Sequence, residues 1–274
     1  MRPFTYVRPT DLAAAIALLA EHGDDARVLA GGTDLIIRLR DGTYEPKIVV
    51  DVKRIPEMAP AIDVGDGDVR ISAGTVMTEV IEHPVIRQHF PALVEAARFV
   101  GSVQIRNRAT LAGNQCNASP AADTAPPLLV YDARLVLTGP SGEREVPLDR
   151  FFVRSGVTAL APGELVTAIV LPLPTGRVGS AFQRRTRRRG HDLASVTLAV
   201  AVEDRGMTRL AYGSLGPRPL LFVDQSGDPD TESMFAAARP SPTSMRAGPE
   251  YRLAMLRVLA ERALGTARDR LAAA

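Results

Sequence analysis

The sequence has no tryptophan, and its 274 residues include a single cysteine, Cys116. One thiol excludes an intramolecular disulfide, and it also excludes a zinc site or an iron–sulfur cluster held by four cysteines of this chain alone. Long apolar runs are missing as well, since residues 193–202 fall far short of the roughly 20 that a membrane-spanning helix needs. The first residues lack the continuous apolar stretch of a secretory signal. These absences predict a cytoplasmic protein without a membrane span.

A large net charge is absent too, because 33 Lys and Arg residues nearly balance 31 Asp and Glu residues, for a formal net charge of +2. Such a balance does not favour nucleic acid as a partner of the whole molecule. The main local exception is a basic run of Arg184, Arg185, Arg187, Arg188 and Arg189. A nucleic-acid surface would need stacking aromatics, and only Phe182 is near. We interpret the run as a solvated strand edge or as a patch facing a partner protein.

Residues that perform acid–base or metal chemistry form no recognisable pattern. The Rossmann glycine motif, the Walker loop, the nucleophile elbow and the HExxH motif are all absent. The four histidines are scattered, without metal-ligand spacing, at His22, His83, His89 and His191. The sequence therefore predicts no metal site and no catalytic acid–base pair in this chain.

The first fifty residues alternate short apolar strands with helices. Thr10 is the predicted N-cap of the first helix, and Gly23 ends it. A second helix over residues 34–40 follows the Gly31-Gly32 turn and is stopped by Gly42. With strands over residues 4–7, 27–30 and 47–52, this pattern predicts a small βαβαβ-like lobe.

The rest of the chain has a different pattern of elements. For the middle third we predict strands over residues 69–73, 135–137 and 164–171. We predict helices over residues 78–90 with a break at Pro84, over residues 91–100, and from residue 126 onward. For the last third we predict antiparallel strands over residues 181–188, 193–202 and 207–214, and a terminal helix over residues 249–264. The predicted class is α+β with mixed sheets, in three units: 1–56, 57–174, and a C-terminal antiparallel-sheet and helix domain, 175–274.

Two segments rich in small residues, 29–35 and 110–114, share a design. Adjacent small residues let backbone N–H groups approach a phosphate, because no bulky side chain stands between them. A helix that begins behind the first segment adds an attraction for negative charge. Two such segments can hold the two phosphates of a dinucleotide from either side. The alternative is that each is an ordinary tight turn.

Further motifs stand in a fixed order around these two segments. Residues 30–34, Ala-Gly-Gly-Thr-Asp, are followed by Gln-Ile-Arg-Asn at 104–107, Thr-Leu-Ala-Gly-Asn at 110–114 and Asn-Ala-Ser-Pro-Ala-Ala-Asp at 117–123. In this order they resemble the FAD-binding medium subunit of molybdenum hydroxylases, the family that includes carbon monoxide dehydrogenase medium subunits and the flavin domain of xanthine dehydrogenases. The resemblance covers nearly the whole chain, through residues 4–9, 162–165, 181–182, 192–194 and 248–252.

The resemblance implies a two-lobed FAD-binding domain followed by the C-terminal domain, with FAD as the cofactor of this chain. The first segment would hold the pyrophosphate through backbone amides, and the second would meet the diphosphate and the ribityl chain from the other side. Asp123 would hydrogen-bond the polar part of the cofactor, the alternative being an N-cap of the helix near Pro126. The implied cofactor-binding residues are Leu29, Ala30, Gly31, Gly32, Thr33, Asp34, Leu35, Thr110, Leu111, Ala112, Gly113, Asn114, Asp123, Leu165 and Gln183.

Three positions depart from the family or leave a choice open. Ala112 stands where the family often has glycine, which is tolerable if this residue needs no positive φ. Gln183 stands where relatives often place a lysine near the flavin, with Arg184 next. Cys116 lies beside the second segment and is interpreted as a small buried filler, the alternative being a redox thiol.

The resemblance also implies the place of this chain in a larger enzyme. A large subunit would carry a molybdenum–pterin centre, a small subunit two [2Fe–2S] clusters, and this chain would pass electrons through FAD to an external acceptor. The expected assembly is a dimer of heterotrimers. Two alternatives stay open at this point: a stand-alone FAD-dependent oxidoreductase, and a scaffold of the same fold that has lost the flavin.

Overall fold

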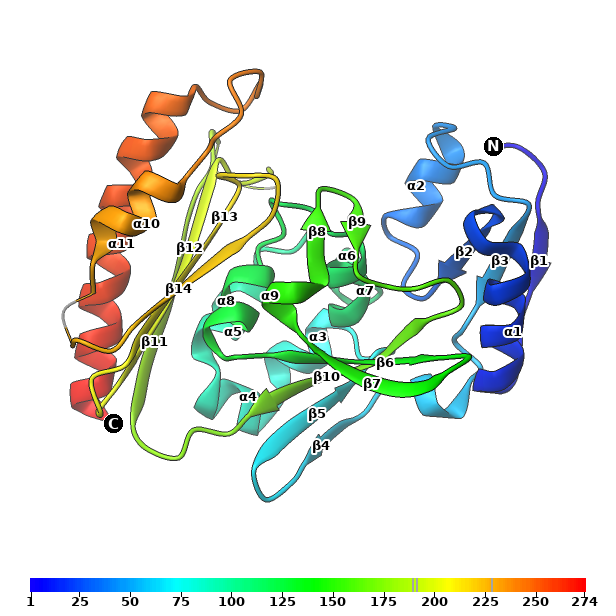
Figure 1. Ribbon diagram of the computed structural model, residues 1–274, viewed down its shortest axis with the longest axis horizontal. Helices are drawn as coiled ribbons and strands as arrows, with labels where there is room; N and C mark the ends of the chain where they lie inside the picture. Colours follow the sequence, from blue (N-terminus) through cyan, green and yellow to red (C-terminus); the bar gives the residue numbers. More distant parts are fainter. Residues whose placement is uncertain (189, 191, 228) are drawn as a thin grey trace.

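The computed structural model describes residues 1–188, 190, 192–227 and 229–274. The N-terminal lobe is a three-stranded parallel sheet in the order β1-β3-β2 (Figure 1). The central strand β3 is buried at every position and pairs with both neighbours, which confirms the predicted βαβαβ pattern. The elements are β1 Thr5–Val7, α1 Leu12–His22, η1 Gly23–Asp25, β2 Ala26–Leu29, α2 Leu35–Arg40 and β3 Ile48–Asp51.

The predicted cap of α1 was wrong by one residue. Asp11, not Thr10, is the N-cap, and its carboxylate accepts a 2.8 Å hydrogen bond from the backbone N–H of Ala14. The N-cap is the position from which a side chain reaches the unpaired N–H groups of the first turn, and Asp and Thr are both suited to it. The end of the helix at Gly23 agrees with the prediction.

The middle lobe contains a five-stranded antiparallel sheet in the order β4-β5-β10-β6-β7, with a separate two-stranded pair, β8-β9. Its outer strands β4 and β7 were not predicted, because their sequences are polar and solvent-facing, as edge strands permit. The strands are β4 Ile62–Val64, β5 Asp68–Ser72, β6 Arg134–Gly139, β7 Gly142–Pro147, β8 Phe152–Arg154, β9 Val157–Thr158 and β10 Leu165–Pro172. The helices are η2 Pro56–Met58, α3 Met77–Glu82, α4 Pro84–His89, α5 Pro91–Ala97, α6 Val103–Arg106, α7 Leu111–Cys116, α8 Ala125–Val130 and α9 Leu148–Phe151.

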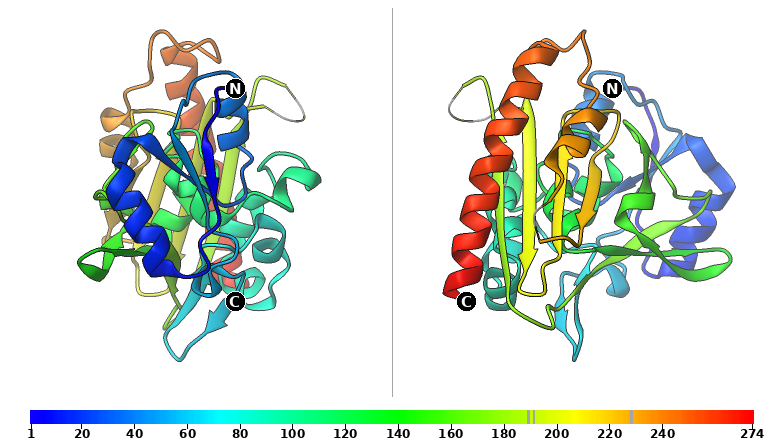
Figure 2. Two further views of the ribbon diagram at one scale, coloured as in Figure 1. Left: turned by 90° about the vertical axis from the view of Figure 1, so that its right-hand side faces the viewer. Right: turned by 60° about the vertical axis from the view of Figure 1, so that its left-hand side comes forward.

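The C-terminal unit is a four-stranded antiparallel sheet in the order β11-β12-β13-β14. The long helix α11 covers one face of this sheet, and α5 and α8 of the middle lobe pack on the other (Figures 1 and 2). Strand β14 was not predicted, and α11 continues past the predicted end at residue 264 because buried Ala267 still faces the sheet. The elements are β11 Val178–Arg185, β12 Val196–Glu203, β13 Thr208–Gly213, β14 Leu220–Asp224, α10 Thr231–Ala237 and α11 Pro249–Ala273.

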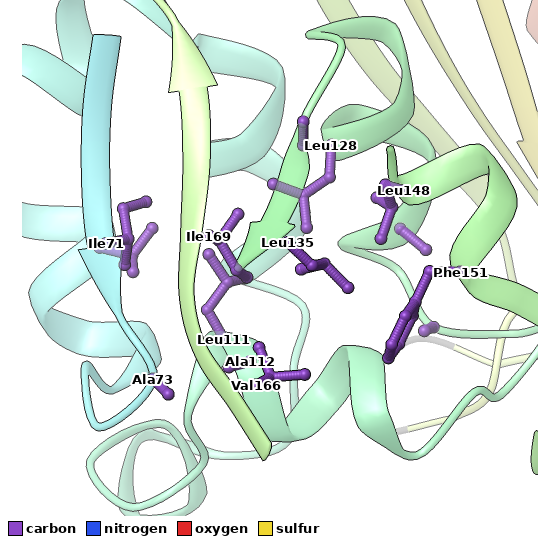
Figure 3. Packing of buried hydrophobic residues seen from close by; sticks show 14 of the residues in the cluster. Ile71, Ala73, Leu111, Ala112, Leu128, Leu135, Leu148, Phe151, Val166 and Ile169 are labelled. Carbon is purple, nitrogen blue, oxygen red and sulfur yellow. The ribbon is translucent and has the colours of Figure 1, made fainter. Parts of the chain in front are cut away.

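The hydrophobic core is continuous across the first two lobes, and a second cluster lies between the C-terminal sheet and α11. Figure 3 shows Leu111 and Ala112 of α7 beside Val166 of β10, with Ile71 and Ile169 on adjacent strands. The α+β class, with parallel and antiparallel sheets, is therefore confirmed. Each sheet lies within one of the three predicted units, whose boundaries stay an interpretation. Within the described residues, none of the helices has the length and apolarity to cross a membrane.

Candidate functional site

A cleft of about 490 Å³ lies between the N-terminal lobe and the middle lobe. This volume is within the usual range of small-molecule sites. Residues 30–35 of the first small-residue segment line it, as do Thr110 and residues 112–114 of the second, together with Asp123 and Leu165. Leu29, Leu111 and Gln183 are not part of its lining. The fold thus brings most of the predicted residues to one cavity, although the two segments are some eighty residues apart.

The first segment contacts, at Gly31, the backbone just before the second segment. A Cβ on this residue would lie 2.0 Å from the carbonyl oxygen of Arg108, just before the second segment. At Gly32 the reason for glycine is different, because φ is +78° and an added Cβ would point at the Leu29 side chain, 2.9 Å away. Both glycines are therefore required by the backbone itself. The sequence led us to expect that glycine at these positions leaves room for a phosphate. Instead, a Cβ at either position would meet other atoms of the chain.

The first segment lines the cleft and has unpaired backbone donors. Among the described residues, no acceptor makes a hydrogen bond to the backbone N–H groups of residues 31–34. Asp34 is the N-cap of α2, but its exposed side chain makes no capping hydrogen bond. A row of free N–H groups at a concave surface is suited to an anion with several oxygens, such as a diphosphate. The residues present here fit that group.

The second segment forms the N-cap and the first turn of the short helix α7. The Thr110 hydroxyl caps α7 by accepting a 3.0 Å hydrogen bond from the Gly113 N–H. Leu111 is completely buried in the core, and its N–H donates to the Thr75 carbonyl. Ala112 is in the helix without positive φ, so the methyl that departs from the family costs no backbone strain. The segment is short but firmly anchored to the strands beneath it.

Asp123 lies on the cleft wall, in a loop fixed by α7. The neighbouring Thr124 donates a 2.6 Å hydrogen bond to the Asn114 side chain and accepts one from Gln115. Thr124, not Asp123, is the N-cap of α8, so the alternative role of Asp123 as a helix cap is not observed. Burial raises the pKa of the Asp123 carboxyl to about 6, an effect that the nearby Arg184 charge partly offsets. Its buried Oδ1 makes no hydrogen bond with the described residues.

Arg184 was assigned to a basic run interpreted as a solvated strand edge or a patch facing a partner protein, and it does not itself line the cleft. Its side chain is only 8% exposed, with Nε 3.4 Å from Asp123 Oδ1 and the guanidinium 4.7 Å from the Phe99 ring centre. Side chains alternate along β11, so Arg184 shares a face with Phe182 while Gln183 points to the other face. The interpretation as a solvated edge is therefore wrong for Arg184.

The rest of the basic run is closer to its prediction. Arg185, Arg187 and Arg188 are exposed and make contacts with Tyr251, Met245 and the Asp192 carboxylate. Arg189 and His191 lie outside the described residues. The described histidines, His22, His83 and His89, do not line the cleft.

Two arginines that line the cleft were not predicted from the sequence. The Arg27 and Arg38 guanidiniums lie 4.8 and 5.0 Å from the centre of the Tyr44 ring, and all three residues line the cleft. Neither arginine forms an ion pair with a carboxylate of the described chain, since Arg27 donates to main-chain carbonyls and Arg38 to the Tyr44 hydroxyl. Two such cations beside the free N–H groups favour an anionic ligand. Each comes from a different element, so no local motif revealed them.

The remaining wall of the cleft is mostly apolar. Leu165 and Val166 at the start of β10 are nearly buried and line it, while the adjacent Glu164 is held by a bidentate contact with Arg144. Cys116 also lines the cleft, and burial raises the pKa of its thiol to about 12. A thiol this hard to ionise behaves as a small apolar side chain. Its side chain is only partly buried, so the predicted role as a buried filler stays a prediction.

The comparisons with known proteins agree with a cleft that binds an anionic cofactor. Residues 2–174 match the sequence model of a family described as the FAD binding domain in molybdopterin dehydrogenase. A putative xanthine dehydrogenase FAD-binding subunit of Escherichia coli (strain K12) is 33% identical over 96% of this chain and 95% of its own length. The carbon monoxide dehydrogenase medium chain of Hydrogenophaga pseudoflava is 30% identical over 98% of each chain.

A solved structure of the carbon monoxide dehydrogenase from Hydrogenophaga pseudoflava, which lacks the molybdenum-pyranopterin moiety of its cofactor, matches with a TM-score of 0.90 at 30% identity, over 98% of this chain and 99% of that one. The fold and the cleft define a flavin-binding subunit of an oxidoreductase. The chain belongs to the family of FAD-binding subunits of molybdenum hydroxylases. The resemblance stated from the sequence motifs is confirmed.

Proposed function

We propose that this chain is the electron-transfer subunit of a molybdenum hydroxylase complex, in which it passes electrons from iron–sulfur clusters through FAD to an external acceptor. One observation carries the proposal: two segments far apart in the sequence meet at Gly31 and Arg108 along one cleft. That cleft combines the free N–H groups of residues 31–34 with the cations of Arg27 and Arg38. When bound, FAD supplies the chemistry, because it accepts and releases two electrons.

Each wall of the cleft then binds a different part of FAD. The N–H groups of residues 31–34 and the two arginines bind the diphosphate, and residues 112–114 close on it from α7. Asp123 accepts a hydrogen bond from the ribityl hydroxyls. Leu165 and the neighbouring Val166 offer the apolar surface that a flavin ring needs. Leu29, Leu111 and Gln183 act from behind this layer, since none of them lines the cleft.

The proposed partners are a large molybdenum–pterin subunit and a small subunit with two [2Fe–2S] clusters, in a cytoplasmic dimer of heterotrimers. Cys116 is the only cysteine, so such clusters need another chain. The rim of the cleft supports a protein partner, because Phe99, Val103 and Ile105 expose 51%, 59% and 36% of their surface around α6. Exposed apolar groups of this kind mark interaction surfaces. An electron donor docked there would be close to the cleft.

The test is purification of the tagged chain from cells that contain its neighbouring reading frames. We expect a complex that contains molybdenum, iron and FAD, in which the FAD stays with this subunit when the subunits are separated. A flavin-containing chain that oxidises a substrate without any partner would establish the stand-alone oxidoreductase instead. A folded chain that takes up no FAD would establish the scaffold that has lost the flavin.

A further inference from the structure

The Asp123 carboxylate is a buried acceptor on the cleft wall with a vacant hydrogen-bonding position. Its side chain is 11% exposed, and Oδ1 is in contact with Arg184 Nε at 3.4 Å without a hydrogen bond to any described residue. A buried acceptor left unpaired costs free energy, so an arrangement like this one indicates a ligand that completes it. The cleft side is where such a donor can approach.

Arg184 is held in place by contacts from three separate parts of the chain. Its Nη2 donates a 2.6 Å hydrogen bond to the Asp192 main-chain carbonyl, and its plane lies over the Phe99 ring. Asp123 supplies the third contact. Planar guanidiniums are suited to such combined stacking and hydrogen bonding, and a lysine cannot reproduce it. The cation is therefore fixed beside the carboxylate before any ligand arrives.

We propose that Arg184 is a positioning residue that keeps Asp123 ionised at neutral pH and ready to accept a hydrogen bond from the ribityl hydroxyls of FAD. The proposal rests on the proposed function, and it goes beyond that function by assigning a role to a residue that need not touch the cofactor. Phe99 and Asp192 contribute indirectly, because they hold the guanidinium at its place.

Burial and the neighbouring charges determine the pKa of the Asp123 carboxyl. Burial raises the carboxyl pKa to about 6, and the Arg184 cation lowers it. The Asp192 carboxylate is engaged by other arginines, Glu164 is paired with Arg144, and Asp34 is exposed on the N-terminal lobe. Burial therefore makes the Asp123 carboxyl harder to ionise than an exposed one, and the Arg184 cation favours its ionised form. Without Arg184 the pKa rises further, so the ionised acceptor is available only at higher pH.

The experiment measures the dissociation constant of FAD for the flavin-free chain, from the quenching of FAD fluorescence between about pH 5 and about pH 8. In the natural chain we expect binding to weaken as the pH falls through about 6. Oxidised FAD has no group that titrates in this range, so the protein must supply the change. Asp123→Asn should bind more weakly at neutral pH and show no such dependence.

Arg184→Gln should move the midpoint to higher pH, because the cation that lowers the Asp123 pKa is lost, and it should weaken FAD binding most at pH values below the natural midpoint. Arg185→Gln is the matched control on the same strand, because that exposed arginine contacts Tyr251 and should leave the profile unchanged. Arg184→Met keeps a long side chain over Phe99 without the charge, and it carries the same prediction if the Gln variant does not fold.

Two results would overturn the inference. A midpoint in Arg184→Gln or Arg184→Met equal to that of the natural chain, with weaker binding at every pH, would show a purely structural role. A natural chain whose FAD affinity does not change across this range would show that an ionised Asp123 is not needed. A natural chain that binds no FAD at any pH would instead contradict the proposed function, so the two failures are distinguishable.

Discussion

Gly31 is the point at which the two sides of the cleft touch, through a position that has no side chain. The Arg108 carbonyl oxygen occupies the space that a Cβ would take, at 2.0 Å. Backbone at such a distance cannot move aside as a flexible side chain can. The close approach of residues 31–34 to the chain before α7 therefore requires a residue without a Cβ at position 31.

Gly31→Ala should separate the two segments and reduce FAD retention. Overpacking of this kind costs about 1–3 kcal/mol of folding free energy. We expect a lower flavin-to-protein absorbance ratio and a lower melting temperature. Gly67→Ala is the control, because no atom lies within 4 Å of its added Cβ. Full flavin content in Gly31→Ala would mean that the contact is not needed for binding.

Cys116 allows a chemical test of its surroundings. Because burial raises the pKa of its thiol to about 12, the thiolate is scarce at neutral pH. Iodoacetamide at about pH 8 should leave the native chain unmodified and alkylate it after denaturation, as mass spectrometry can show. Cys116→Ala should retain the electron-transfer rate of the natural chain. Rapid alkylation of the folded protein would favour the redox thiol that we set aside.

The helix α7 is too short to be stable alone, and contacts at its N-terminal end hold it in position. Thr110 caps it, and the adjoining residues are bonded to the link between β5 and α3, where Met77 donates to the Ala109 carbonyl. Leu111 in the core holds the first turn from below. Short helices gain most of their stability from such tertiary contacts. The cap therefore affects both the fold and the cleft.

Thr110→Ala should cost about 1 kcal/mol of unfolding free energy, which is typical of a lost N-cap. Urea denaturation measures this loss, and the FAD affinity should fall together with it because Gly113 loses its acceptor. Thr110→Ser keeps the hydroxyl and should remain close to the natural chain in both measurements. Equal losses in the Ser and Ala variants would mean that the methyl, not the hydroxyl, is what matters.

The arrangement of the complete chain depends on how the C-terminal unit joins the middle lobe. Arg270 near the end of α11 contacts the Glu95 carboxylate of α5 and the Ser180 carbonyl of β11. Glu95 also accepts a 2.9 Å hydrogen bond from the Phe182 N–H. This network fixes β11, and with it Arg184, against the cleft. A contact far from the cofactor region thus affects the geometry of the site.

Arg270→Ala should loosen this junction and cost about 1–2 kcal/mol, because hydrogen bonds to charged groups exceed neutral ones but both side chains are partly exposed. Limited proteolysis should release the C-terminal unit sooner, and the melting temperature should fall by a few degrees. Arg262→Ala, at an exposed position of the same helix, is the control. Equal proteolysis rates in both variants would contradict the role of the junction.

Local patterns in the sequence were sufficient for the class, most of the helices and strands, and the family. Apolar periodicity marks α1 and α11 because burial on one face leaves a repeat in the chain itself, and the continuous apolar run of β3 marks a fully buried strand. The small-residue segments could be recognised because they depend on backbone geometry, which glycine alone allows at Gly32. The polar edge strands β4 and β7 carry no such repeat, and they were missed.

The composition of the cleft, in contrast, was decided by tertiary contacts. Arg184 does not line the cleft but contacts the cleft residue Asp123, sixty residues away in the sequence, because the two-residue period of β11 places its side chain on the opposite face from Gln183. Arg27 and Arg38 meet at Tyr44 only because β2 and α2 fold together. Charges that act across space leave no mark on neighbouring residues in the chain, so a linear pattern could not reveal which of them share the site.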